Sequence, residues 1–389
     1  MSFKLNNAIT SVEAPPIAEA LTWVRAERNR ALIDLCQALP KYPPAEEVAR
    51  EIGRLALEPS TNLYTDILGV GELRSTLAGH MADEYGGEIT PSNVAITAGC
   101  NQAFAAAMMV LAGTGNNIIL PVPFYFNHDM WLRMLRIEPR YLHAIGNGSA
   151  VPKPADALRL IDGETRAIVL CTPNNPTGAV YPPETIREFF EIARSRDIAL
   201  IIDETYKDFR ESPRAPHDLF RHDHWEKTFI QLYSFSKSYA LYGYRVGSII
   251  AGRPFIADLE KVLDCLVICA PHISQRAALF SLSALAAWKT EKLNMMRERA
   301  RALTTAFQVS GLRYELLSAG AFFAYLRHPF VGESAKSVAQ RLAREHDLLC
   351  LPGPMFGPNQ DDYLRLAFAN VESERMSEVV ERLIESQHQ

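Results

Sequence analysis

Long apolar runs and strongly basic segments are both missing from this sequence of 389 residues. No stretch of about 18 uncharged apolar residues occurs, which argues against a membrane-spanning helix, and the N-terminal segment lacks the apolar centre of a signal peptide. Forty Lys and Arg residues against 45 Asp and Glu residues give a formal net charge of −5, which argues against nucleic-acid binding. We therefore expect a cytoplasmic protein that binds neither nucleic acid nor membranes.

Cysteine and histidine are scarce, and neither is clustered. The six cysteines are scattered between Cys36 and Cys350 without a CxxC pair, and the ten histidines form no group with the spacing of metal ligands. Reduced and mostly buried thiols are the simplest interpretation. We therefore expect no metal site.

Apolar runs and helix-length segments alternate between about residues 90 and 252. The sequence is 48% hydrophobic and 22% charged, as is ordinary for a globular protein. The strand-like runs are residues 94–97, 117–121, 166–171, 198–203, 228–233 and 245–251. Strand and helix in this order predict an α/β fold with a mainly parallel sheet, in which ligands bind beyond the carboxyl ends of the strands.

The remainder of the chain predicts a smaller α+β unit. Residues 315–329 are typical of two strands, 334–346 of a helix and 364–368 of a strand, and a closing helix follows. Residues 271–308 predict one long helix, because neither Gly nor Pro interrupts residues 273–307. We expect a large domain of residues 45–275 and a small domain that combines residues 1–44 with 276–389.

Lys237 lies in the segment SFSKSYALYGYR, residues 234–245. Most lysines are solvated surface charges, but Lys237 follows an apolar strand and precedes aromatic and apolar residues. Such surroundings favour desolvation and a lowered pKa, and a neutral amine can attack an aldehyde. Arg245 opens the next strand-like run, and a phosphate group would satisfy Arg245 together with the nearby serine hydroxyls.

Candidate site residues lie at the ends of three further strand-like runs. Asp203 ends a run too apolar for an unpaired carboxylate, so it either needs a cationic partner, such as the pyridinium nitrogen of a cofactor, or caps a turn or pairs with arginine. In CTPNNPTG, residues 171–178, turn formation explains the Pro and Gly residues but not the side chain of Asn175. At Gly99 a strand turns into a helix, and the amides of a helix N-terminus can bind phosphate.

Three motifs stand out together: PNNPTG, DETY, and SFSK with Arg245 eight residues after its lysine. They resemble the motifs of the class I/II aminotransferases, which belong to the fold type I enzymes that use pyridoxal 5′-phosphate (PLP). The resemblance extends from about Ile33 to Asn370. It implies a large domain with a mainly parallel seven-stranded sheet between helices, a smaller α+β domain, PLP as the cofactor and a homodimer with shared active sites.

The resemblance also implies catalytic roles for Lys237, Asp203 and Tyr206, and a cofactor- and substrate-binding role for Asn175. Lys237 corresponds to the lysine that holds the cofactor as a Schiff base and carries protons, and Asp203 corresponds to the partner of the pyridine nitrogen. Tyr206 and Asn175 correspond to donors to the ring hydroxylate oxygen, and Asn175 also lies near the substrate.

Further positions correspond to residues that bind the cofactor or the substrate. The implied phosphate contacts are Gly99, Cys100, Asn101, Ser234, Ser236, Arg245 and, from the neighbouring subunit, Tyr64. Cys100 and Asn101 stand where many relatives have a small or hydroxyl residue, so backbone amides are expected to serve there. Tyr125, or Phe124 beside it, corresponds to the aromatic that stacks on the ring. Arg365 corresponds to the arginine that binds the substrate α-carboxylate, and Ala38 replaces a glycine of the family.

The substrate class is harder to infer from the sequence. No second arginine is evidently placed for a side-chain carboxylate, so we expect an aromatic or other apolar L-amino acid rather than aspartate as the donor. Aromatic residues near the motifs suit such a substrate, although they are equally ordinary core residues. The resemblance implies ping-pong transfer of the amino group to a 2-oxo acid. The alternatives are another fold type I PLP enzyme, such as a cysteine-conjugate β-lyase, and a non-catalytic PLP-binding protein.

Overall fold

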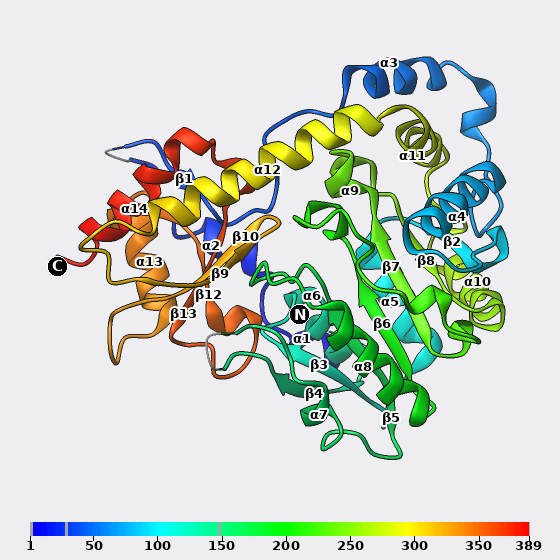
Figure 1. Cartoon of the computed structure of the whole chain (residues 1–389), viewed down its shortest axis with the longest axis horizontal. Helices are drawn as coiled ribbons and strands as arrows, with labels where there is room; N and C mark the ends of the chain where they lie inside the picture. The colour runs from blue at the N-terminus through cyan, green and yellow to red at the C-terminus, as the bar shows by residue number, and fades with distance from the viewer. Residues whose placement is uncertain (1–2, 28–29, 147–148, 389) are drawn as a thin grey trace.

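A seven-stranded sheet forms the largest layer of the protein (Figure 1), whose computed structural model describes residues 3–27, 30–146 and 149–388. The strand order is β2-β8-β7-β6-β5-β3-β4. The strands are β2 (Val94–Thr97), β3 (Asn117–Val122), β4 (Glu138–His143), β5 (Thr165–Cys171), β6 (Ala199–Asp203), β7 (Phe229–Ser234) and β8 (Gly247–Ile250). Neighbouring strands pair in parallel except at β8, which is antiparallel to both β2 and β7. The predicted mainly parallel seven-stranded sheet is confirmed.

The central strands are apolar throughout because helices cover both faces of the sheet. Along β5, Ile168 and Leu170 pack into one core, whereas Ala167 and Val169 pack into the core on the opposite face. Successive strand residues point to opposite sides, so burial on both faces removes the alternation of apolar and polar residues. Edge strand β4 was not among the six predicted runs, since most of its residues are exposed or half-buried and its sequence is correspondingly polar.

Helices from different parts of the chain form the two covering layers. One core contains side chains from α3 (Glu46–Leu55), α4 (Gly71–Tyr85), α8 (Pro183–Ser195) and α11 (His272–Ala284). The other contains side chains from α5 (Cys100–Leu111), α6 (Phe126–Met134) and α10 (Arg253–Val267). The short helix α7 (Pro154–Ala157) lies beside α8. The sheet is therefore the middle layer of three.

A second unit contains the C-terminal part of the chain and the N-terminal arm. Its antiparallel sheet has the order β12-β13-β10-β9, from β9 (Glu315–Gly320), β10 (Phe323–Arg327), β12 (Leu351–Pro352) and β13 (Tyr363–Ala367). Its other elements are α2 (Pro16–Leu21), α13 (Ala335–Glu345) and α14 (Met376–Glu385). The short helix α1 (Asn7–Thr10) of the arm packs against α6. From the arm, β1 (Ile33–Asp34) pairs in parallel with β11 (Leu348–Leu349). The domain limits at residues 45 and 275 remain a prediction.

The single long helix predicted for residues 271–308 is wrong, because the chain forms two helices that meet at Leu285. There α11 ends, and α12 (Ala286–Ala306) begins at the next residue. Ser281 and Ser283 near the end of α11 donate their hydroxyls to the carbonyls four residues earlier, an arrangement that bends helices. Figure 1 shows α12 extending from the α11 end of the molecule to α14. This helix links the two units, as expected.

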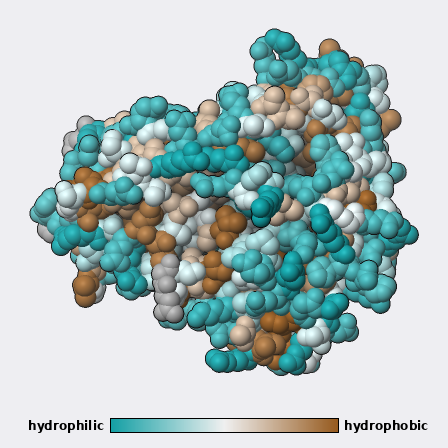
Figure 2. Space-filling view, in the orientation of Figure 1, coloured by the Kyte–Doolittle hydropathy of each residue, from teal (hydrophilic) through white to brown (hydrophobic). Residues whose placement is uncertain are grey.

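Most of the surface in the view of Figure 2 is hydrophilic, with apolar side chains in separate small groups. Exposed large apolar residues include three near the start of the chain, Phe3, Leu5 and Ile9, and two in the segment after α3, Leu57 and Leu63. No helix in the described part of the chain combines the length and the apolar character needed to cross a membrane.

Candidate active site

A cavity of about 340 Å³ lies where the carboxyl ends of the central strands meet the N-terminal arm and the second sheet. Twelve of the predicted site residues line it: Ala38, Cys100, Asn101, Tyr125, Asn175, Asp203, Tyr206, Ser234, Ser236, Lys237, Arg245 and Arg365. Parallel strands end at the same edge of a sheet, so residues that are distant in sequence converge there. The structure therefore brings together nearly all of the predicted residues, while their individual roles remain predictions.

Gly99 forms the turn between β2 and α5 and lies against the guanidinium group of Arg245. Its φ of +88° favours glycine, and a Cβ atom at this position would come within 2.3 Å of Arg245 Nη2. The first N–H groups of α5, including those of Cys100 and Asn101, belong to the helical turn whose amides have no intrahelical acceptor. Nη1 of Arg245 also lies 3.4 Å from the hydroxyl of Ser236. These donors and the positive charge suit a phosphate group.

Lys237 lies in the one-turn helix α9 (Phe235–Ser238), directly after β7. Its Nζ atom donates to the carbonyl oxygen of Ala38, 2.8 Å away. Burial, together with the nearby cations Arg245 and Arg365, lowers the pKa of Lys237 to about 8. About a tenth of the amine is therefore neutral at pH 7, and the neutral form is the one that attacks an aldehyde.

Asp203 at the end of β6 is almost completely buried and accepts three hydrogen bonds. The donors are the backbone N–H of Thr205 at 3.0 Å, Nε2 of His128 at 3.2 Å and the thiol of Cys100 at 3.7 Å. Burial alone would raise the pKa of Asp203, but the interactions with His128 and Thr205 outweigh it and lower the pKa. The carboxylate is therefore ionised and can face a cationic ring nitrogen.

Arg365, in the middle of β13, is 1% exposed and lines the cavity. Its Nη1 atom donates to Oδ1 of Asn175 at 3.2 Å, and its Nη2 atom donates to the carbonyl of Cys36. The guanidinium group also lies near the rings of Phe323 and Phe356, at 5.3 and 5.0 Å. Among the described residues its Nε atom has no hydrogen-bond partner. A buried cation with a free donor is suited to a substrate carboxylate.

Of the two aromatic candidates for stacking on the cofactor ring, only Tyr125 lines this cavity. Phe124 stacks instead on Tyr141, with ring centroids 5.6 Å apart. Tyr206, the other predicted aromatic residue, is packed edge-to-face against Phe322 and Phe323. The geometry therefore favours Tyr125 over its neighbour.

Two predicted residues do not line the cavity. Gly99 is not a lining residue, but it lies against the guanidinium group of Arg245, which is one. Tyr64 is 77% exposed and lies in the segment between α3 and α4. A side chain there is free to meet another molecule, but its contact with a neighbouring subunit stays a prediction.

Sequence reasoning did not assign several residues that line the cavity or support it. The additional lining residues are Ile17, Gln37, Leu39, Phe126, Cys171, Thr205 and Tyr242. Most of them adjoin predicted residues, and extending each motif by one position would have found Gln37, Leu39, Phe126 and Thr205. His128, which stacks on Phe104 at 4.1 Å, is a single histidine within a helix, and no local pattern marks it.

The cavity fits PLP in the chemistry of its donor set. A cradle formed by Gly99 and Arg245 suits a phosphate, the ionised Asp203 suits a protonated pyridine nitrogen, and the amine of Lys237 suits an aldehyde. The same cavity also holds Arg365, which can orient a substrate carboxylate relative to these groups.

Comparison with known proteins agrees with this geometry. A family model described as aminotransferase class I and II matches residues 30–383. An aromatic aminotransferase of Arabidopsis thaliana is 26% identical over 375 residues, which cover 95% of this chain and 92% of that protein. An aspartate aminotransferase of Sulfolobus acidocaldarius is 25% identical over 380 residues and covers 93% of both chains.

Solved structures share the fold. A mutant aspartate aminotransferase of Thermus thermophilus superposes with a TM-score of 0.88 at 24% identity, covering 99% of this chain and all of that chain. At this level of identity the likeness concerns the fold, including the large mixed sheet and the separate antiparallel sheet.

Proposed function

Since the chain belongs to the class I and II aminotransferases, which depend on PLP, we propose that it moves the amino group of an aromatic or other apolar L-amino acid to a 2-oxo acid by a ping-pong mechanism. The observation that carries the proposal is the meeting of Lys237, Asp203 and Arg365 in one cavity. When bound there, PLP supplies an electron sink that lowers the barrier to breaking the bond between the substrate Cα and its proton.

The residues of this chain then have separate tasks. Arg365 and Asn175 bind the substrate α-carboxylate and set the orientation of the Cα–H bond. The Nζ atom of Lys237 would accept the proton from the substrate Cα and then donate it to the cofactor rather than back to Cα, because its lowered pKa makes both protonation states accessible near pH 8. Asp203 keeps a positive charge on the ring nitrogen, and Tyr206 and Asn175 donate to the ring oxygen.

The lining of the cavity supports an apolar substrate. Among the described residues that line it, the charged ones are Asp203, Lys237, Arg245 and Arg365, and each already has a task in the proposal. No further cation is present there to pair with a side-chain carboxylate. Ile17, Leu39 and Phe126 contribute apolar surface, which favours an aromatic or aliphatic side chain through burial.

We also propose that two copies of the chain form a homodimer with shared active sites, in which Tyr64 reaches the cofactor phosphate of the neighbouring subunit. The exposed side chain of Tyr64 supports this, as do the apolar side chains of Leu57 and Leu63 nearby, which are 86% and 65% exposed. The cytoplasmic location remains a prediction from the sequence.

The test is an absorbance titration of the PLP-loaded protein with single amino acids. We expect a visible band that Lys237→Ala abolishes, and phenylalanine, tyrosine or methionine should remove it at lower concentration than aspartate. Without a 2-oxo acid acceptor, a ping-pong enzyme should release about one equivalent of 2-oxo acid per site. A preference for aspartate would contradict the proposed substrate class, and a band unaffected by Lys237→Ala would contradict the role of the lysine.

The same samples distinguish transamination from β-elimination. A cysteine conjugate that yields pyruvate, ammonia and a thiol over many turnovers, without an acceptor, would identify a β-lyase instead. Release of only one equivalent of product, followed by recovery of the band on addition of a 2-oxo acid, supports the aminotransferase.

A further inference from the structure

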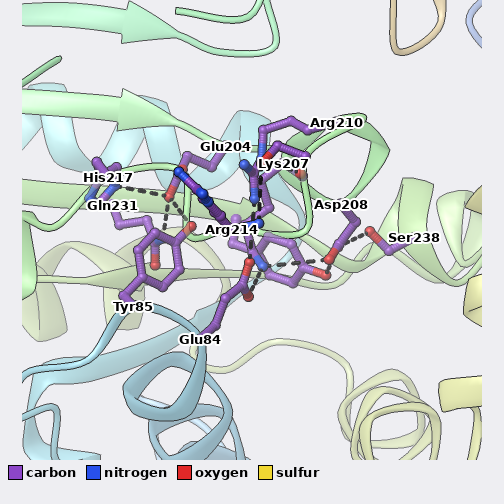
Figure 3. A network of polar contacts seen from close by, with 12 residues as sticks. Glu84, Tyr85, Glu204, Lys207, Asp208, Arg210, Arg214, His217, Gln231 and Ser238 are labelled. Carbon is purple, nitrogen blue, oxygen red and sulfur yellow. Dashed lines mark hydrogen bonds and ion pairs between the residues drawn. The ribbon is translucent and has the colours of Figure 1, made fainter. Parts of the chain in front are cut away.

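A buried carboxylate, Asp208, lies beside Ser238, the residue that follows Lys237 (Figure 3). It follows Tyr206 by two residues, and its side chain is only 7% exposed. Its Oδ2 atom accepts hydrogen bonds from the hydroxyls of Ser238 at 2.5 Å and Tyr233 at 2.9 Å. Tyr233 immediately precedes Ser234, and Ser238 immediately follows Lys237. One oxygen atom therefore joins the two ends of the segment that lines the cavity.

Two lysines hold the other oxygen of Asp208. Its Oδ1 atom lies 3.3 Å from Nζ of Lys289 in α12 and 3.5 Å from Nζ of Lys207. Lys207 is itself 3% exposed and pairs with Glu84 of α4. Burial alone would raise the pKa of Asp208, but these ammonium groups and the two hydroxyls hold it far below its usual range. The carboxylate is therefore ionised, and its hydrogen bonds are of the stronger, charge-assisted kind.

These contacts form one part of a larger polar network. In Figure 3, Asp208 and Lys207 lie beside a second group, in which Glu204 accepts hydrogen bonds from Tyr85 and Gln231. Asp208 is the member of the network that bonds directly to the Lys237 segment. Its side chain links the 3-10 turn Lys207–Phe209, which follows β6, to β7, α9 and α12.

Asp208 does not line the cavity and does not set the charge state of Lys237. The lowered pKa of Lys237 comes from burial and from Arg245 and Arg365. Helix α9, however, has only four residues, and a single helical turn is not stable without tertiary contacts. An external anchor is therefore needed to hold the lysine in place.

We propose that Asp208 is a positioning residue that holds Lys237 at the distance and angle from the cofactor site that its reaction requires. The anchor acts through Ser238 and Tyr233, and because Asp208 follows Tyr206 closely, it also fixes the lysine relative to that tyrosine. The inference rests on the role proposed above for Lys237. Displacement of a reacting group by about 1 Å typically costs about 100-fold in rate.

The first experiment compares Asp208→Asn with Asp258→Asn, which removes the same charge from an exposed ion pair with Lys261 in α10. The readout is the rate at which protein freed of PLP gains visible absorbance when PLP is added, together with kcat and KM. We expect Asp208→Asn to slow attachment and kcat by about 100-fold with little change in KM, and Asp258→Asn to match the wild type. Attachment by folded Asp208→Asn at the wild-type rate would overturn the proposal.

A second pair of variants decides the matter if Asp208→Asn does not fold. Ser238→Ala removes one donor to Asp208, whereas Ser238→Thr retains a hydroxyl. Slow attachment by the alanine variant and recovery in the threonine variant support the proposal, and equal, wild-type rates in both overturn it. The wild type and Lys237→Ala are measured alongside as a test of the lysine itself. A wild type that never forms the visible band would refute the proposed function, not the positioning role of Asp208.

Discussion

Lys237 is a buried amine surrounded by cations, and this setting controls when it can react. Burial and the positive charges of Arg245 and Arg365 bring its pKa from 10.5 to about 8. Below both values, the neutral fraction of the amine is about 300-fold larger than for an ordinary lysine. The cations proposed to bind phosphate and carboxylate thus also lower the pKa of the proposed nucleophile.

The rate of PLP attachment to the cofactor-free protein should therefore rise with pH and level off just above pH 8. Only the neutral amine attacks, so the rate follows its fraction, which increases as pH passes upward through the pKa of the folded state. Stopped-flow absorbance between pH 6.5 and 9.5 would measure this profile. A rate that still rises tenfold per pH unit above pH 9 would contradict the lowered pKa.

Arg365→Lys tests the proposed binding of the substrate carboxylate by Arg365. Lysine keeps the charge but loses the planar set of donors that binds Asn175 and the carbonyl of Cys36 and that we propose to bind the substrate carboxylate. We expect kcat/KM for the amino acid to fall by about 100-fold, while PLP attachment in the absence of substrate changes little. The same replacement at Arg301, which is 71% exposed on α12, serves as the control and should leave kcat/KM unchanged.

At the scale of elements, the active site depends on close contact between loops of the two units. Gly178 in the PNNPTG turn has φ +73°, and a Cβ atom there would come within 2.5 Å of the backbone N and O of Gly320 at the end of β9. Ser318 of the same strand donates its hydroxyl to the carbonyl of Thr177 at 2.6 Å. The turn that carries Asn175 is thus held directly against the second sheet.

Gly178→Ala should destabilise the protein by about 2–4 kcal/mol, because the added methyl group collides with backbone and the left-handed conformation disfavours alanine. Gly163→Ala is the matched control, since Gly163 has no atom within 4 Å of the added Cβ and no positive φ. Its effect should stay within about 0.5 kcal/mol. Urea unfolding followed by circular dichroism measures the stability of both variants. Equal midpoints would contradict the prediction, because they would show that the backbone around Gly320 accommodates the methyl group without loss of unfolding free energy.

At the scale of the whole molecule, side chains from both units complete the cavity. Ala38 comes from the N-terminal arm and Arg365 from the second sheet, while Lys237 and Asp203 follow strands of the large sheet. A small core between them contains Tyr206, Met296 of α12 and Phe323. Helix α12 therefore contacts both units next to the cavity, and the proposed dimer would add one more residue, Tyr64.

Mixing two inactive variants tests the shared site. In a dimer of one Tyr64→Ala chain and one Lys237→Ala chain, one site receives both mutations and the other receives neither. Refolding the two together at equal amounts should therefore restore about a quarter of the wild-type activity, while each variant alone stays weak. If the mixture is no more active than the sum of its parts, Tyr64 does not act across subunits. Sedimentation velocity on the same samples reports whether dimers form.

Local sequence determined much of this protein. Lys237 and Asn175 each follow an apolar run, and Asp203 ends one, at the same edge of the sheet. This pattern marked them as candidates, and the family resemblance supplied their proposed roles. The same runs predicted six of the seven large-sheet strands, because strands buried on both faces must be apolar throughout. The motifs were specific enough to indicate the family, although not the preferred substrate.

Only the tertiary structure decided the features that depend on neighbours distant in sequence. Edge strand β4 is polar because most of its residues are exposed or half-buried, whereas the other edge strand, β2, is buried and apolar. The bend at Leu285 arises without Gly or Pro, where hydroxyls bond to the helix backbone. His128 acquires its place beside Asp203, and Asp208 its place beside Ser238, through packing of separate elements. Such contacts are set by which surfaces meet in three dimensions, and no short stretch of sequence records that.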